Sequence, residues 1–271
     1  MRAALSPMAA RSVAALSVAA LLATCAHTPP VATSAAALRA ALADPSRPES
    51  EVKRDVNRKP AEVIAFAGIR PGDRVGELMP GRGYFTHIFC KLVGDKGHVY
   101  TLRIARVVQE GAPPPDLAAT APLAAGAAAG GPPAGQACGN VTADEQPPLS
   151  AALPGGLDVV WTSENYHDLH NRAFGAVDMT RFNRMIYESL RPGGVFLVED
   201  HAAAAGSGAR DTDTLHRIDA ELVKREVLSA GFVFDGASDV LHNPDDPHTD
   251  VVFKLGGRSD KFLLRFRRPA R

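Results

Sequence analysis

Two short stretches of the chain carry side chains suited to acid–base catalysis: residues 163–168 (SENYHD) and residues 199–201 (EDH). An imidazole titrates near neutral pH, so His167 could act as a general base. We expect Asp168 and His201 to share its catalytic site. The structural alternative is that His167 and Asp168 only cap backbone groups where a helix begins.

A metal ion is a second alternative for the same side chains. Glu199, Asp200 and His201 could join His167 and Asp168 around a divalent cation, because His and carboxylate groups are common ligands. That arrangement requires four side chains to converge, whereas a base requires one. We therefore predict catalysis by a base, without a metal. The chain has no C-x-x-C pair, which argues against a zinc site made of thiolates.

Each of the two stretches follows an apolar strand, at residues 157–163 (LDVVWTS) and 195–200 (VFLVED). Helical spacing predicts a helix at 179–190 between them, and a long helix through Leu215 and Leu222 up to Gly231. Three more strands are expected near the end, with the sequences FVFDGAS, DVVFKL and KFLLRF. This order predicts a Rossmann-like α/β fold, with a mostly parallel sheet, an antiparallel edge strand and helices on both faces.

A glycine-containing turn lies early in the chain. Residues 75–89 (VGELMPGRGYFTHIF) read as a strand, a turn at Met79 to Gly83, and an amphipathic helix. Many nucleotide-type cofactors are held by a strand, turn and helix in this order. Because ligands of open α/β sheets bind outside the carboxyl ends of the strands, this turn and the two polar stretches should meet at one edge.

Four segments in this order resemble the class I S-adenosylmethionine-dependent methyltransferases: GELMPGRGYFT, DVVWTSENYHDLH, LRPGGVFLVEDH and HTDVVFKL…DKFLLRFRRP. The resemblance runs from about Glu51 to Arg268 and is closest to a bacterial group of predicted, often exported methyltransferases. It implies S-adenosylmethionine as the cofactor, with Glu77 receiving its cationic amino group. The residues that the resemblance places around the cofactor are Glu77, Met79, Gly81, Gly83, Tyr84, Asp144, Asn165 and Tyr166.

Two positions depart from the family pattern. Met79 stands where the first glycine of the motif is usual, while Gly81 and Gly83 match the other two. An acid at the end of the second strand usually holds the ribose, but Leu102 and Arg103 lie there. A carboxylate from the neighbourhood of Asp144 or Glu145 could take its place.

The N-terminal region has the features of an export signal. Arg2 and Arg11 precede a short apolar stretch, and LATC, ending at Cys25, resembles a lipoprotein box. We expect a signal peptide at 1–25, a disordered tether at 26–50, and a methyltransferase-like domain at 51–271 with a low-complexity insertion at 111–137. The protein would then be periplasmic, either released or tethered to the membrane through a lipidated Cys25.

The composition of the chain limits the classes of molecule that it is expected to bind. Lys plus Arg and Asp plus Glu number 30 each, so no bulk charge favours nucleic acid, and we expect a small-molecule substrate. We expect a buried free thiol at Cys90 rather than a disulfide to Cys138. The predicted function is methylation of a small molecule at oxygen or nitrogen. The alternatives are a binding protein with another ligand on this fold, and a metal-assisted hydrolase that uses the His and Asp residues.

Overall fold

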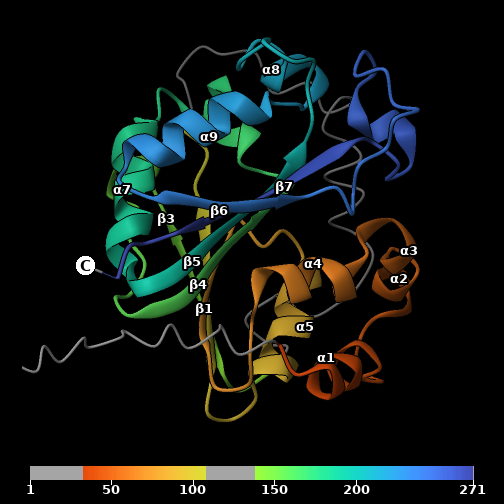
Figure 1. Cartoon of the computed structure of the whole chain (residues 1–271), viewed down its shortest axis with the longest axis vertical. Coiled ribbons are helices and arrows are strands. Elements are labelled where there is room, and N and C mark those ends of the chain that lie inside the picture. The colour runs from red at the N-terminus through yellow and green to blue at the C-terminus, as the bar shows by residue number, and fades with distance from the viewer. Residues whose placement is uncertain (1–32, 108–137, 271) are drawn as a thin grey trace, which may run out of the picture. The chain divides into compact units, whose positions relative to one another are not determined.

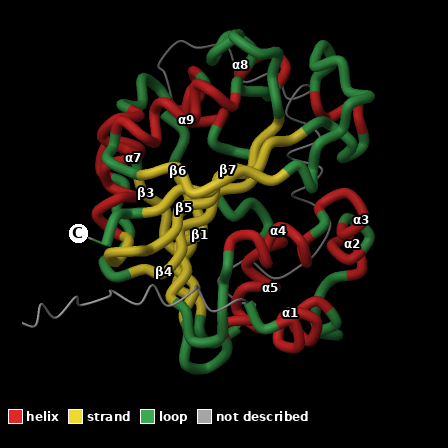
Figure 2. Tube along the Cα trace, in the orientation of Figure 1, coloured by secondary structure: helices red, strands yellow, loops and turns green. Residues whose placement is uncertain are grey.

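The computed structural model describes residues 33–107 and 138–270, which form a seven-stranded sheet in the order β3-β2-β1-β4-β5-β7-β6 (Figures 1 and 2). The first five strands of that order are parallel, while β7 runs antiparallel to both β5 and β6. The strands are β1 (Arg74–Leu78), β2 (His98–Ile104), β3 (Val141–Gln146), β4 (Leu157–Ser163), β5 (Leu190–His201), β6 (Val233–Ser238) and β7 (Lys261–Arg267). The predicted fold class is confirmed.

Helices lie on both faces of the sheet (Figure 1). The described helices are α1 (Ala35–Leu42), α2 (Glu49–Val52), α3 (Asp55–Arg58), α4 (Pro60–Ala67), α5 (Tyr84–Val93), α7 (Met179–Ser189), α8 (Thr212–Leu215) and α9 (Ala220–Ser229). One core contains α1, α4 and α5 with sheet residues such as Val75 and Trp161. The other contains α7 and α9 with sheet residues such as Leu78 and Phe196. Side chains therefore alternate between two separate apolar layers along each strand.

Two predicted elements are wrong near the end of the chain. DVVFKL is not a strand, since residues Val252–Leu255 form a 3₁₀ turn. The long helix expected up to Gly231 is interrupted at His216, whose φ of 55° is left-handed. The chain then pairs with the end of β5 at Ile218 before α9 starts. Asp219 caps α9 by accepting a hydrogen bond from the amide of Glu221, at 3.0 Å.

The folded unit starts earlier than predicted. Residues 35–42, expected in the tether, form α1, whose Leu38 and Ala41 are buried in the core with α5. Arg47 forms an ion pair of 2.7 Å with Asp55 and so fastens the next segment. The predicted signal peptide with Cys25, and the insertion at 111–137, lie outside the described residues. Within the described ranges, the structure has no helix long and apolar enough to cross a membrane.

A disulfide joins Cys90 of α5 to Cys138, so the predicted free thiol is wrong. The Asn140 amide brings the two together, because its Nδ2 donates to the carbonyls of Cys90 (3.0 Å) and Gly94 (2.9 Å). This anchor places the start of β3 against the end of α5. Sequence separation gives no indication of such proximity.

Reducing this disulfide should lower the free energy of unfolding by about 2–4 kcal/mol, because the bond restricts the unfolded chain. Its cysteines are 48 positions apart, so the loop that it closes is long. Urea denaturation with and without a reductant measures the difference. The double variant Cys90→Ala/Cys138→Ala is the control, and its midpoint should not respond to the reductant. Equal stability of oxidised and reduced wild type would contradict this expectation.

Candidate functional site

The turn after β1 lies where the strand order reverses, since β1 has β2 on one side and β4 on the other. Met79, Gly81 and Gly83 all have positive φ, of 46°, 59° and 91°. Met79 thus adopts the left-handed backbone that favours glycine, which explains why a glycine is usual at this position. A Cβ added to Gly81 would meet no atom within 4 Å, so this side of the turn is open to a ligand.

Asn165 fixes the turn to the end of β4. Its Nδ2 donates to the carbonyl of Met79 at 2.7 Å, and its Oδ1 accepts from Thr162 Oγ1 at 2.5 Å. The Met79 amide donates to the carbonyl of Leu102 in β2, at 2.7 Å. Three neighbouring strands therefore hold the left-handed backbone of Met79 in place.

Glu77 is a buried carboxyl group at the end of β1, with 3% of its surface exposed. Thr86 Oγ1, in the first turn of α5, donates to its Oε2 at 2.5 Å. Burial raises the pKa of Glu77 to about 7, because the charged form loses its hydration. A cation placed beside Glu77 would reverse this effect by favouring the carboxylate.

More charged groups lie beside Glu77 on the same face of the sheet. Glu164 is ion-paired with Arg58 of α3, and its Oε1 is 3.6 Å from Lys261 Nζ. Burial opposes the charged form of Glu164, but Arg58 and its other cationic neighbours lower the pKa to about 2. Burial and the charge of Glu164 raise the pKa of Glu199 to about 7. The Oε1 atom of Glu199 is buried without a hydrogen-bond partner.

His167 lies at the same sheet edge and is bound to Asp200. Its Nδ1–H donates to Asp200 Oδ1 at 2.8 Å, and its backbone amide donates to Oδ2 at 2.7 Å. Burial opposes the charged imidazole, but the Asp200 carboxylate raises the pKa of His167 to about 9. The contact with Asp200 thus favours the protonated imidazole, and the role of general base for His167 stays a prediction.

His201 lies close to His167, with ring centroids 5.9 Å apart. A hydrogen bond of 2.8 Å joins its Nδ1 to Ser259 Oγ. Burial lowers the pKa of His201 to about 3, and it stays neutral at physiological pH. It is a neighbour of the catalytic group predicted from the sequence, without a direct bond to it.

His216 completes a compact cluster with His167 and Asp168, in which one ligand atom from each residue lies within 4.8 Å of the others. His167 Nε2 is 3.3 Å from His216 Nδ1 and 3.4 Å from Asp168 Oδ1, and these last two atoms are 3.9 Å apart. Of the side chains that the sequence offered for the alternative of a metal site, only His167 and Asp168 belong to this cluster. Asp200 instead supports His167, and Glu199 faces the Arg58 side.

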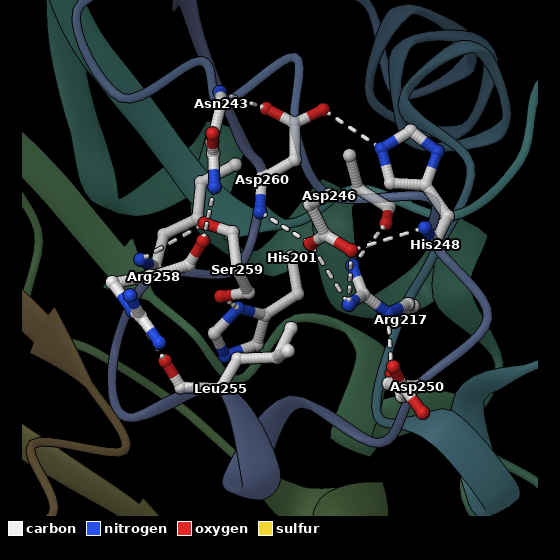
Figure 3. A network of polar contacts seen from close by, with 12 residues as sticks. His201, Arg217, Asn243, Asp246, His248, Asp250, Leu255, Arg258, Ser259 and Asp260 are labelled. Atoms are coloured by element: carbon white, nitrogen blue, oxygen red, sulfur yellow. Dashed lines mark hydrogen bonds and ion pairs between the residues drawn. The ribbon is translucent and has the colours of Figure 1, made fainter.

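A buried network holds the backbone around His216 (Figure 3). Arg217 is fully buried and donates to the carbonyls of Ala202 (2.9 Å) and Asp250 (3.0 Å), and its Nη2 is 2.9 Å from Asp246 Oδ2. Asp246 also accepts from the amide of Asp260, at 2.6 Å. These bonds fasten the segment before β7 to the end of β5, and they leave His216 facing His167.

The comparisons with known proteins give structural matches only. No protein-family model matches the sequence, and no curated protein matches it either. A SAM-dependent methyltransferase from Aquifex aeolicus matches with a TM-score of 0.51 at 16% identity, over 86% of this chain and 98% of that one. The chain has the class I methyltransferase fold.

Two further solved structures are similar to this chain. The [4+2]-cyclase SpnF matches with a TM-score of 0.51 at 15% identity, over 90% of this chain and 98% of that one. An S-adenosylmethionine-dependent methyltransferase from Mesorhizobium loti has a TM-score of 0.49 at 18% identity, over 79% of this chain and all of that one. Identities this low show the fold alone, so the function must be argued from the site.

Two aromatic residues predicted at the cofactor are used elsewhere in the methyltransferase fold. The Tyr166 hydroxyl donates to Glu226 Oε2 (2.9 Å) and accepts from Asn183 Nδ2 (2.8 Å), so its ring lies in the core with α7 and α9. The Tyr84 hydroxyl donates to Asp55 Oδ1 at 2.6 Å, which anchors α3. Neither phenol group faces the open side of the turn.

Asp144 lies on β3 beside Leu102 at the end of β2, and its role at a ribose stays a prediction. It is exposed on β3, where it accepts from the Gln146 side-chain amide at 2.6 Å and from the Glu145 backbone amide at 2.8 Å. Arg103, at the end of β2, is exposed and 3.4 Å from Glu145. The described residues therefore place no carboxylate at the end of β2, where the fold usually has one.

Sequence reasoning missed two residues of the site, Arg58 and His216. Arg58 comes from a one-turn helix, and its guanidinium lies 4.7 Å from the ring centroid of Tyr84. Nothing in the local sequence indicates that it reaches Glu164. His216 was assigned to a continuous helix, although Asp219 three residues later is a typical helix cap and could have indicated the break.

Proposed function

We propose that the protein is a methyltransferase that uses S-adenosylmethionine to methylate a small molecule at oxygen or nitrogen. The observation that carries this proposal is the buried Glu77 beside the open turn at the point where the strand order reverses. A ligand with an ammonium group could donate a charge-assisted hydrogen bond to the Glu77 carboxylate. The shared fold with a SAM-dependent methyltransferase supports the same assignment.

The residues fit one half of this cofactor better than the other. Glu77 can accept from the amino group, and the backbone of the open turn at Gly81 can approach the methionine portion closely. At the edge formed by β2 and β3, the carboxylate of Glu145 is available to the ribose only as part of an exposed ion pair with Arg103. When bound, the cofactor would supply the methyl group. The chain's part is to orient it and to exclude water from the reacting atoms.

Export remains part of this proposal. The apolar stretch before Cys25 is the sequence feature that supports a signal peptide, and release or lipidation at Cys25 would follow. The Cys90–Cys138 disulfide agrees with it, because disulfides persist mainly in oxidising compartments such as the periplasm.

Calorimetric titration tests the proposal directly. We expect S-adenosylmethionine and S-adenosylhomocysteine to bind one per chain, and methylthioadenosine to bind at least about tenfold more weakly, since it lacks the amino acid that Glu77 recognises. Equal affinity for methylthioadenosine would remove Glu77 from the site. If neither S-adenosylmethionine nor S-adenosylhomocysteine gives a binding heat, the assignment of the cofactor is refuted.

A further inference from the structure

We propose that His167, Asp168 and His216 bind a divalent transition-metal ion, with Zn²⁺ as the best match, and leave a coordination position open. Four ligands about 2.0–2.1 Å from Zn²⁺ at tetrahedral angles lie roughly 3.3–3.4 Å from one another. The cluster has separations of 3.3, 3.4 and 3.9 Å between His167 Nε2, His216 Nδ1 and Asp168 Oδ1. Two imidazoles and one carboxylate are a common ligand set for catalytic zinc and for non-haem iron.

The partners of these side chains are those that metal ligands require. Asp200 accepts from Nδ1–H of His167, so the Nε2 atom is the one that faces the cluster. A carboxylate behind a histidine in this way fixes the tautomer of the ligand and orients its ring. Asp168 is oriented too, because Asn171 Nδ2 donates to its Oδ1 at 2.8 Å.

His216 takes part at the expense of an unfavourable backbone. Its φ of 55° is uncommon for a residue with a side chain, and such conformations gather at functional sites. Arg217, the residue after His216, is held in place by its buried hydrogen bonds. The ring of Phe253 lies 4.6 Å from that of His216. The imidazole is therefore held toward His167 rather than toward solvent.

The cluster is open on one side. The side chain of His167 is 3% exposed, while those of Asp168 and His216 are 28% and 20% exposed. Exposed Arg106 acts electrostatically on Asp168 and His216. A metal here could thus bind the anionic oxygen of a small molecule, such as a carboxylate or an ionised hydroxyl, with Arg106 close by.

The same distances also suit a metal-free cluster in which His167 donates to His216 and Asp168, so the test is metal binding itself. We would strip the purified protein with a chelator and titrate it with Zn²⁺, without adenosylmethionine. We expect one ion per chain, and at least about 100-fold weaker binding in His216→Gly. Glycine adopts positive φ freely, so this variant should fold. Asp168→Asn should also weaken binding, and Co²⁺ in the wild type should show the visible bands of a tetrahedral site.

His242→Ala is the matched control. His242 is a second histidine paired with a buried carboxylate, Asp260, at 2.9 Å, but it lies outside the cluster and is 54% exposed. The His242→Ala protein should bind Zn²⁺ with the same affinity as the wild type. Absence of binding, or binding that His216→Gly leaves unchanged, would overturn the proposal. Since no cofactor is present, either result is independent of the proposed methyl transfer.

Discussion

Arg58→Ala should lower the free energy of unfolding by about 3 kcal/mol. Breaking a buried ion pair costs about 3–5 kcal/mol, because the remaining charge loses its partner without regaining water. The Arg58 and Glu164 side chains are 11% and 19% exposed, and Lys261 stays 3.6 Å from Glu164, so we expect the lower end. Arg58 also leaves the face of Tyr84, where its guanidinium is 4.7 Å from the ring centroid. Urea denaturation at pH 7 measures the loss.

Two variants show whether the lost charge is responsible. In Arg58→Ala/Glu164→Gln, much of the stability should return, because no unpaired carboxylate remains. Lys53→Ala removes an ion pair with Glu49 whose side chains are 72% and 83% exposed, and it should change stability by less than about 0.5 kcal/mol. An Arg58→Ala protein as stable as Lys53→Ala would show that the Arg58–Glu164 contact carries no free energy.

Glu77→Gln should strengthen the fold at alkaline pH and weaken the binding of S-adenosylmethionine. The pKa of Glu77 rises from 4.5 to about 7 on folding, which corresponds to about 3 kcal/mol at 1.36 kcal/mol per pKa unit. A raised pKa means that the folded state favours the protonated carboxyl group. Stability from this group is therefore complete below pH 4.5 and is lost as the pH rises to about 7. Glutamine stays neutral and avoids that loss.

The measurement is the difference between the unfolding free energies of Glu77→Gln and wild type. It should be close to zero at pH 4.5 and reach up to about 3 kcal/mol in favour of Gln at pH 8. Calorimetry at pH 8 should show a loss of about 1.5–3 kcal/mol in cofactor binding, the range for a hydrogen bond to a charged group. Glu188→Gln, at an exposed position in the last turn of α7, should change neither quantity. An unchanged affinity in Glu77→Gln would contradict the role assigned to Glu77.

Strands and the overall order of elements were predictable because burial on both faces makes parallel strands apolar throughout. Residues 157–163 form β4 as expected, and the strand expected at 195–200 lies within β5. The polar residues after β4 and β5 could be placed at one edge for the same reason. The contacts between side chains at that edge could not be predicted. His167 meets His216 only because the expected helix is interrupted and the chain pairs with the end of β5 at Ile218.

The charge states of His167 and His201 could not be predicted from the sequence either. The pKa of an imidazole is expected to lie near neutral pH. Asp200 raises the pKa of His167 to about 9, while burial lowers the pKa of His201 to about 3. The shifts differ because Asp200 accepts a hydrogen bond from the His167 ring, whereas burial outweighs the effect of nearby Glu164 and Asp200 on His201.

The covalent bond between Cys90 and Cys138 also has a consequence for the integrity of the chain. Every peptide bond from residue 91 to residue 137 lies inside the loop that this bond closes. A protease that cuts there, including within the Gly-, Ala- and Pro-rich stretch at 111–137, produces two polypeptides that remain one molecule. A cut within 111–137 leaves β1 and β2 in one fragment and β3 to β7 in the other. The protein can thus be nicked at its least complex segment and still present a complete sheet edge.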